Sequence, residues 1–508
     1  MRYVFVISVF LLLACLPAAA QSPSQLDIQS PPNVLQLTLA EAQRLALERN
    51  LDLQAQQYDT RASDAEINKA YGLYDPTLGL EYAEGESRQR LNLQFYSAQS
   101  KERYRRFNLG LTQKLPTGAD LNLEFINLRS DQEPAPGLNP SYDSTLTFSL
   151  VQPLLKGFGS TVTEQDILFA VKGRDIAIED LRETAFLTLA DTRDAYFEVL
   201  RLRDNLRYRE ASVALAATLL KENRARVKAG VLARVDELEA EFGLKQRERD
   251  LLDAEREYQD GIDGIALLLN IQGEISLAED QVGIPEVKAD LSEGYRQALV
   301  KRPDVQRRLR NIERLELQSR IARNAILPAL DLAASYGHAG LGQEYSDDLD
   351  DLGSDRFRNW EIGLTLSYPL GNREARHEYR RSEFERKGRQ AQLGQLKNQV
   401  YTEVQAAIRL LLVSRKKIDV TASGMAFAEE KLRTLLKRKE VGLATTRQVL
   451  EGEEDYALAQ TDHAAALSDY NKSVTEYLKV TGRLLEEEHV RFIGDFDDES
   501  QSLLGLEP

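Results

Sequence analysis

A glycine-rich stretch, Lys156-Gly-Phe-Gly-Ser160, raises the first question about chemistry, because its residue types could bind a phosphate group. It follows the alternating segment "STLTFSLVQP" and precedes "TVTEQDILFAVKGRDIAIEDL", which has helical periodicity. A strand, a glycine-rich turn and a helix form a setting for phosphate binding, because backbone N–H groups at a helix N-terminus attract anions. The stretch is therefore either a nucleotide loop or a passage from a strand to a helix.

Other patterns that would indicate catalysis or metal binding are missing from the sequence. The four histidines do not have the spacing of metal ligands, and the chain has no Gly-x-Ser-x-Gly, His-Glu-x-x-His or paired-cysteine pattern. We therefore expect no catalytic residue, no metal site and no cofactor, and we predict that the protein is not an enzyme.

The N-terminus has the pattern of a secretory signal. Arg2 precedes an apolar run over 4–14, and an A-x-A cleavage site ends at Ala20. We predict cleavage after Ala20, with a signal peptide at 1–20 and a linker at 21–36. The segment Leu12-Leu-Ala-Cys15 also resembles a lipobox, so lipidation of Cys15, the only cysteine, is an open alternative.

Composition limits what an exported chain of this kind can be. Of 508 residues, 42% are hydrophobic and 29% are charged, which suits a folded chain in water. No run after the signal reaches the ~18–20 apolar residues of a spanning helix, so any membrane crossing must use strands. The formal net charge of −16 disfavours binding to nucleic acid.

The chain contains an internal repeat. The segment at 39–47 matches 291–299, "TFSLVQPL" (147–154) matches "GLTLSYPL" (363–370), and "VKAGVLARVDELEAE" (227–241) matches "KEVGLATTRQVLEGE" (439–453). The sequence therefore predicts a tandem structural repeat. Its parts are repeat 1 at 37–273, a connector at 274–290, repeat 2 at 291–482 and an acidic, partly disordered tail at 483–508.

Each predicted repeat has the same order of elements. A helix (39–72; 291–325) ends near Pro76 or Pro328 and precedes strands at about 77–152 and 329–368. Pro153 and Pro369 then end the strands, and two long helices follow. The long helices are predicted at about 161–228 and 234–270, with a tip at Gly230, and at about 373–439 and 446–481, with a tip at Gly442.

The predicted strands alternate apolar and polar residues, as in Leu78, Leu80 and Tyr82 or in Trp360 and Ile362. A soluble sheet on a core and a membrane barrel both explain this pattern. The repeat also decides the opening question. The segment equivalent to the glycine-rich stretch is Tyr368-Pro-Leu-Gly-Asn-Arg373, which lacks Gly-x-Gly, so we predict a structural turn rather than a nucleotide loop.

The chain resembles the outer-membrane efflux protein family, the TolC-like channels, over about 37–485. The residues that carry the resemblance are Leu39-Ala-Glu-Ala, Tyr74-Asp-Pro-Thr-Leu78 and the tip sequence "VGLAT" at 441–445. The resemblance implies an α+β membrane protein: a homotrimeric transmembrane β-barrel in outer-membrane lipid, continued by a long periplasmic α-helical coiled-coil barrel. It also implies contact with a periplasmic adaptor protein and, through it, with an inner-membrane pump.

The resemblance further implies functional positions at the two tips. Acidic residues just after each tip glycine would close the tunnel, and the candidates for this periplasmic gate are Asp236, Glu239, Gln448 and Glu451. The adaptor would contact the tips themselves, at Ala229, Gly230, Val231, Leu232, Val441, Gly442, Leu443, Ala444 and Thr445.

Besides the processing of the N-terminus, the sequence leaves three questions open. Family members supply four strands per subunit, but an additional strand-like hairpin at 104–129 leaves the count at four or six. A coiled-coil rod with a sheet cap is the alternative to a channel; in a rod, protein would cover the apolar faces of 104–115, 144–152 and 360–368. Nor does the sequence distinguish drug efflux from polypeptide secretion.

Overall fold

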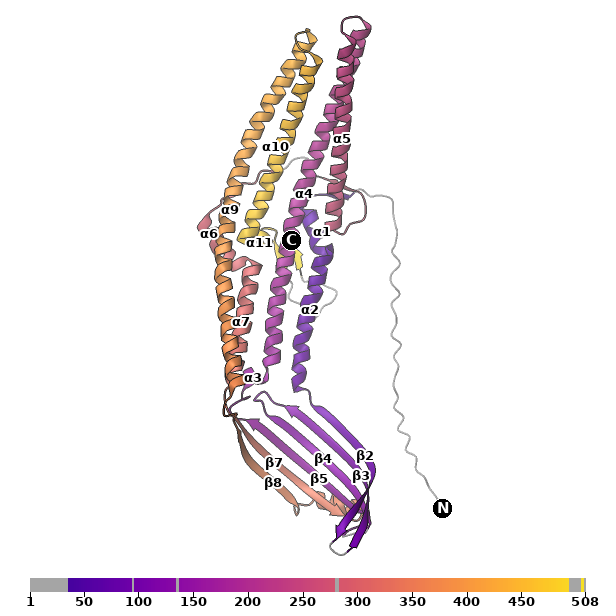
Figure 1. Cartoon of the computed structure of the whole chain (residues 1–508), viewed down its shortest axis with the longest axis vertical. Coiled ribbons are helices and arrows are strands. Elements are labelled where there is room, and N and C mark those ends of the chain that lie inside the picture. The colour runs from indigo at the N-terminus through magenta and orange to yellow at the C-terminus, as the bar shows by residue number, and fades with distance from the viewer. Residues whose placement is uncertain (1–34, 94–95, 134–136, 279–282, 493–503, 507–508) are drawn as a thin grey trace, which may run out of the picture.

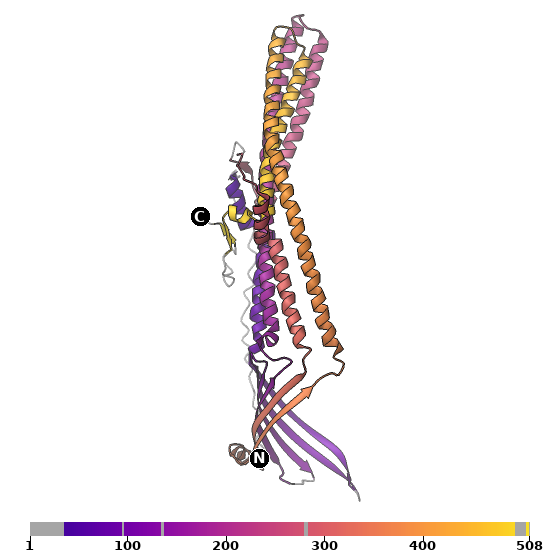
Figure 2. The same cartoon turned by 90° about the vertical axis from the view of Figure 1, so that its left-hand side faces the viewer.

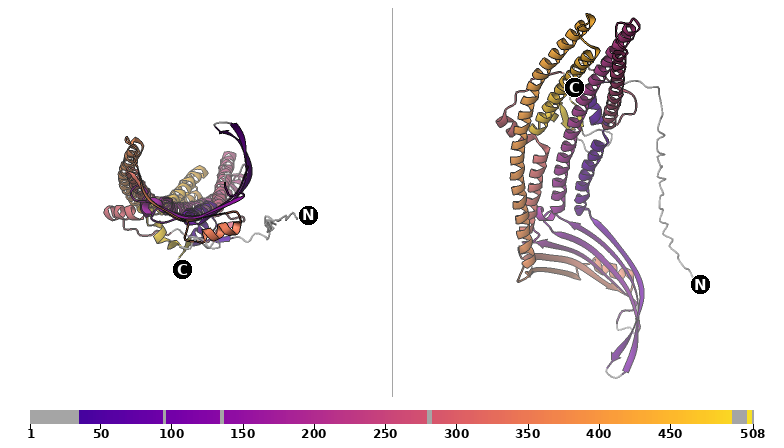
Figure 3. Two further views of the ribbon diagram at one scale, coloured as in Figure 1. Left: turned by 90° about the horizontal axis from the view of Figure 1, so that it is seen from below. Right: turned by 45° about the horizontal axis from the view of Figure 1, so that its top comes forward.

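The computed structural model describes residues 35–93, 96–133, 137–278, 283–492 and 504–506. The predicted signal peptide, with Cys15 and the cleavage site at Ala20, lies outside the described residues. Figure 1 shows a long molecule with a sheet at one end and two helical hairpin turns at the other. Viewed from the side, the molecule is narrow (Figure 2), and viewed from below, the sheet bends into an arc (Figure 3).

Six antiparallel strands form the large sheet, in the order β2-β3-β4-β5-β7-β8. The first half of the chain supplies four of them and the second half supplies two, so the sheet of one chain has six strands, and the hairpin predicted at 104–129 is part of it. The strands are β2 (Thr77–Leu93), β3 (Tyr96–Lys114), β4 (Asp120–Glu133), β5 (Ser141–Pro153), β7 (Ala329–Gly342) and β8 (Arg358–Ser367). A short helix, α8 (Tyr345–Leu352), connects the last two strands.

The pairing register places the alternating apolar side chains of the strands on one face of the sheet. Leu80 lies opposite Leu109, Leu109 opposite Phe125, and Phe125 opposite Leu146. Large side chains on this face are open to the surroundings: Leu80 is 67% exposed and Trp360 is 69% exposed. The sheet therefore presents a continuous apolar face that is not buried within one chain.

The prediction of one continuous helix over 39–72 is wrong. The structure has α1 (Leu39–Arg49) and α2 (Leu51–Tyr71), separated at Asn50, whose backbone is extended. The Asn50 side chain accepts the N–H of Leu53 at 3.0 Å and donates to the Leu268 carbonyl at 3.0 Å. An asparagine that caps the second helix stabilises this break, and the same side chain fastens it to the long helices.

The predicted helix over 291–325 is also two helices, α6 (Leu291–Lys301) and α7 (Pro303–Asn324). The cause is Pro303, which disfavours helical conformation in the preceding residue and is well suited to the first position of a new helix. Arg302 at the junction contacts the carboxylates of Asp304 at 2.8 Å and Glu403 at 2.5 Å. The ion pair with Glu403 connects the break to the long helix that carries this residue.

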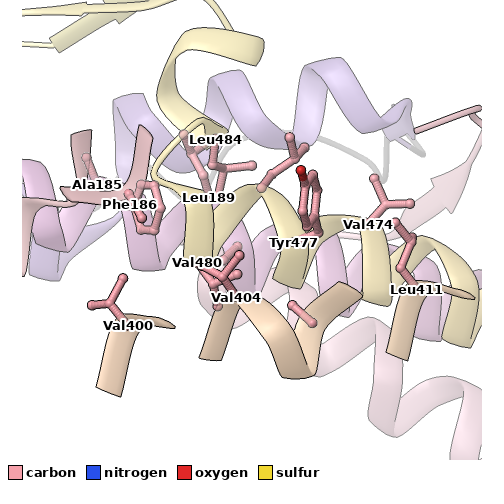
Figure 4. Close-up of a cluster of buried hydrophobic side chains, with 14 of the residues drawn as sticks. Ala185, Phe186, Leu189, Val400, Val404, Leu411, Val474, Tyr477, Val480 and Leu484 are labelled. Carbon is pink, nitrogen blue, oxygen red and sulfur yellow. The ribbon is translucent and has the colours of Figure 1, made fainter. Parts of the chain in front are cut away.

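Two long helical hairpins form the other end of the molecule. They are built by α4 (Gln165–Lys228) with α5 (Arg234–Leu268), and by α9 (Arg373–Glu440) with α10 (Thr446–Thr481). At a rise of ~1.5 Å per residue, α4 is about 96 Å long. Helices of this length need lateral neighbours, and the largest core lies where α4, α9 and α10 meet, around Leu189, Val404 and Tyr477 (Figure 4).

Several short elements lie beside the long helices and were not expected from the sequence. β1 (Leu35–Leu37) pairs in parallel with β6 (Ile275–Leu277), although the two are far apart in the chain. The acidic tail contains α11 (Leu484–Glu487) and two paired strands, β9 (Val490–Phe492) and β10 (Leu504–Leu506). Residues 493–503 and 507–508 of this tail lie outside the described residues.

The glycine-rich stretch connects β5 to α4 through the one-turn helix α3 (Ser160–Thr163). Gly157 and Gly159 both have positive φ, +84° and +93°, which favours glycine. Their N–H groups already have acceptors, because Gly157 donates to Asn324 Oδ1 at 2.9 Å and Gly159 donates to the Thr117 carbonyl at 3.2 Å. The stretch is therefore a structural turn.

The prolines predicted at the strand–helix passages lie at or beside the strand ends. Pro153 is the last residue of β5, and Pro76 and Pro328 come directly before β2 and β7. Pro369 lies two residues beyond the end of β8. Among the residues that the structure describes, no helix combines the length and the apolar character needed to cross a membrane.

The contact between α4 and α10 contains a carboxylate with an altered titration. Burial raises the pKa of Asp194 to about 6, while Lys472 and Lys479 oppose this change. Because the folded-state pKa is higher than the usual value of 3.8, protonation of Asp194 stabilises the fold. This contribution is complete below about pH 4 and is lost as the pH rises through about 6.

We expect Asp194→Asn to raise the thermal unfolding temperature at pH 8 and to change it little at pH 4, because asparagine mimics the protonated acid. Circular dichroism of the protein in detergent at both pH values measures the effect. Asp462→Asn, at an exposed position of α10, is the control and should give no pH-dependent gain. An equal gain at both pH values would contradict the assignment.

Candidate functional site

The two hairpin turns at the far end of the molecule have the same backbone geometry. In the first turn, Gly230 (φ +73°) donates to the Val227 carbonyl, and Val231 donates to the Arg226 carbonyl at 2.9 Å. The second turn repeats this pattern around Gly442, whose φ is +78°. This pair of hydrogen bonds is the Schellman motif, in which a left-handed glycine ends a helix.

Apolar side chains project from both turns. Val231 is 70% exposed, Val441 is 71% exposed and Leu443 is 76% exposed. Leu232 and Ala444 are half-buried, and Ala229, Gly230, Gly442 and Thr445 complete the two exposed turns. Exposed apolar groups concentrated at the end of a charged helical rod are typical of a contact surface.

Two of the candidate gate residues cap helices. The Asp236 carboxylate accepts the N–H of Ala233 at 3.2 Å at the start of α5. Gln448 has the same position in α10, where its side chain accepts the N–H of Thr445 at 2.9 Å and Thr445 Oγ1 accepts the Gln448 N–H at 3.2 Å. These side chains satisfy N–H groups that a helix start leaves unpaired, which explains an acid or amide at both positions.

The other two gate candidates, Glu239 and Glu451, line one groove of about 320 Å³ between α5 and α10. Arg447 lies in the same groove, with its Nε 3.1 Å from the exposed carboxylate of Glu451. The structure thus brings together carboxylates from the two hairpins of one chain.

A buried ion pair that was not predicted from the sequence includes Arg247, which lines this groove. Arg247 Nε donates to the Glu453 carboxylate at 2.5 Å, and both side chains are less than 10% exposed. Arg247 also donates to the Leu450 carbonyl at 2.7 Å. The pair connects α5 to α10. The only sequence signal was the opposite charge of the two residues, because they stand at different distances from their tip glycines.

Asn223 forms a second polar connection between the hairpins. It is fully buried on α4, and its amide donates to the Asp236 carbonyl at 2.9 Å and to Thr446 Oγ1 at 2.7 Å. Lys439 lies buried near the end of α9, and its Nζ has no hydrogen-bond partner among the described residues. Burial lowers the pKa of Lys439, Glu222 opposes this effect and Arg226 adds to it.

Within the described part of the chain, no group of three or more histidine, cysteine or carboxylate side chains is arranged to hold a metal ion. Three surface features of the described residues face the surroundings: the exposed apolar face of the sheet, the two turns, and the groove between α5 and α10.

The fold places the protein in the class of TolC-like channels, in which a β-sheet continues into long helical hairpins. The chain belongs to the outer membrane efflux protein family, whose sequence model matches residues 138–270 and 294–483. This match confirms the family predicted from the sequence. The protein is accordingly an outer-membrane protein with a large periplasmic helical portion.

Individual relatives agree with this assignment. The chain is 22% identical to the outer membrane efflux protein BepC of Brucella suis over 372 residues, 68% of this chain and 75% of BepC. Its fold is similar to the CmeC outer membrane channel of Campylobacter jejuni, with a TM-score of 0.64, 14% identity and 90% of each chain covered. It is also similar to the outer membrane protein VceC of Vibrio cholerae, with a TM-score of 0.62 and 17% identity; the match covers 87% of this chain and 96% of VceC.

We expect Arg247→Met or Glu453→Leu alone to destabilise the hairpin ends by about 3–5 kcal/mol, because each leaves one charge buried without its partner. The double variant should lie close to the wild type, since two apolar side chains of similar volume replace the pair. Limited proteolysis near the turns and thermal unfolding in detergent measure both effects. Single variants as stable as the wild type would show that the two charges do not depend on one another.

Proposed function

We propose that three copies of this chain form a passive exit duct in the outer membrane, fed by an inner-membrane pump through a periplasmic adaptor. The observation that carries this proposal is the sheet, which has an exposed apolar face and open edges at β2 and β8. Unpaired backbone groups are not tolerated in lipid, so strands of neighbouring copies must pair these edges and close a barrel.

The alternative, a coiled-coil rod, requires protein to cover the apolar face. Within one described chain, the middle of this face is open, as Leu80, Leu109 and Leu364 show. Lipid is an occupant that suits such a face in an outer-membrane protein. The name of BepC as an efflux protein supports efflux as the role of this chain; secretion of polypeptides uses the same architecture and remains within the proposal.

In the proposed assembly, the two turns contact the adaptor through Val231, Val441 and Leu443. Each chain would supply two such turns, which agrees with our proposal that the chain arose by tandem duplication. The order of helix pair, strands and long hairpin in both halves supports that origin.

The gate lies at the groove between α5 and α10 in this proposal. Glu239 and Glu451 would each form a ring of three carboxylates, and such rings favour cations and repel themselves at a constriction. Asp236 and Gln448 remain candidates for the tunnel lining, but their side chains are engaged in capping. The capping role makes Glu239 and Glu451 the stronger gate candidates.

In planar lipid bilayers, we expect discrete, cation-preferring single-channel currents from the wild type. The variant Glu239→Gln/Glu451→Gln should conduct about twofold more and lose much of the cation preference, because the rings lose their charge without a change of shape. Glu255→Gln, at an exposed position of α5 away from the groove, is the matched control.

Unchanged currents in the double variant would refute the gate assignment and leave the duct intact. Folded protein that gives no current would refute the duct and favour the rod.

A further inference from the structure

The sheet is wider than the arrangement of the helices requires. Helix α2 leads into β2, and β5 leads into α4; these two helices touch, as the ion pair between Asp64 and Arg174 at 3.3 Å shows. Their strands are nevertheless separated by β3 and β4. In the second half of the chain, β7 and β8 are direct neighbours, and so are α7 and α9, where Ser319 donates to Glu383 at 2.5 Å.

The hairpin of β3 and β4 is fixed to the rest of the sheet at the end that lies next to the helices. Its turn lies against the passage from β5 to α4, where Thr117 Oγ1 donates to Gln152 Oε1 at 2.8 Å and Gln152 Nε2 donates to the Thr117 carbonyl at 3.1 Å. Gly118 in this turn has a φ of +91°, and a Cβ there would lie 2.6 Å from the Gly157 carbonyl oxygen. The turn therefore fits closely only with glycine, and the hairpin is not a loose appendage.

The outward face of this hairpin continues the apolar face of the flanking strands. Leu111 pairs with Leu123, and each is 41% exposed. Both neighbours of the hairpin, β2 and β5, bring apolar side chains into the same rows, such as Leu78 opposite Leu111 and Phe148 opposite Leu123. Nothing would require the apolar side chains of a loop outside the membrane to align with those of the flanking strands.

The opposite face of the sheet is polar and contains many small residues. Gly79 lies opposite Gly110, and a Cβ at Gly110 or at Gly363 would meet no atom within 4 Å. Glu81 accepts from Asn108 at 2.9 Å and lies 3.0 Å from Arg106. The interior of a barrel made from this face would be water-compatible, with open space at Gly110 and Gly363.

We propose that the β3–β4 hairpin widens the barrel, so that three subunits close eighteen strands and the duct passes molecules too bulky for a barrel of four strands per subunit. The inference rests on the trimer proposed above. Barrel diameter grows roughly linearly with strand number, so six rather than four strands per subunit give about 1.5-fold the diameter and about twofold the cross-section. The selective constriction then lies at the helical tips, and the barrel does not limit cargo size.

Deletion of residues 96–133 tests the proposal, because it joins β2 to β5 and keeps their direction. Leu80 and Leu146 already share a row through Leu109 and Phe125, so the apolar faces stay aligned. Polyethylene glycols of increasing size are added to the barrel side of single channels. We expect the largest polymer that lowers the current to have about a 1.5-fold larger radius for the wild type than for the deletion variant.

Native mass spectrometry of both proteins separates this inference from the proposed function. A wild type that is not a trimer would refute the proposed assembly, and with it the count of eighteen strands. If both proteins are trimers and the largest polymer that lowers the current is the same for both, the inference of a wider barrel is refuted. The proposed function as an exit duct would still stand.

A second measurement does not depend on folding of the deletion variant. Spin labels are attached to Leu123→Cys and Glu124→Cys in the full chain in liposomes, with Cys15→Ser as background. We expect the label at 123 to be accessible to oxygen in lipid and the label at 124 to a water-soluble nickel complex. Labels that are both exposed to water would place the hairpin outside the wall and overturn the inference.

Discussion

The pairing of backbone N–H and C=O groups at the two sheet edges is the constraint on which the rest of the structure depends. A single chain offers a sheet that is apolar on one face and unpaired along β2 and β8, and neither lipid nor water alone satisfies both features. In the proposed assembly, closure by further copies would satisfy both at once. It would also require each copy to carry its helices in the same direction, so that a closed sheet is continued by a closed ring of helices. The register through all six strands, with its matched apolar rows, is compatible with that closure.

The helical portion has a different problem, because helices about 100 Å long bury little of their own surface. Two kinds of lateral contact between the helices stabilise this portion. In the middle, apolar side chains from several helices form the large core around Leu189 and Tyr477. Toward the turns the apolar cluster is smaller, and buried polar groups connect the hairpins: Asn223 with Thr446, and Arg247 with Glu453. Polar contacts tolerate little sliding, so they fix the relative height of the two hairpins where an apolar contact alone would permit shifts.

The sequence reveals features that depend on local patterns. Helical periodicity, the glycines at 230 and 442 and the strand alternation predict the long hairpins and the strands, because each is decided within a few residues. The helix breaks carried local signals as well, Asn50 as a cap and Pro303 as a first helical residue, but the surrounding periodicity concealed them. The pairing of β1 with β6 and the ion pair of Arg247 with Glu453 join residues more than 200 positions apart. No pattern in one sequence states which distant residues will face one another.

The tips show why a position in a motif does not by itself define a role. Asp236 and Gln448 both stand six residues after a tip glycine, where an acid or amide serves a helix start as well as it would serve a ring in a tunnel. Both aspartate and glutamine can cap a helix, so the difference between Asp236 and Gln448 has little effect on the stability of the fold. A ring of carboxylates in a tunnel would, in contrast, lose its charge where glutamine replaces aspartate. A carboxylate needed for its charge is better placed where capping does not constrain it. Glu239 and Glu451, one turn further along the same helices and open to a shared groove, meet that condition.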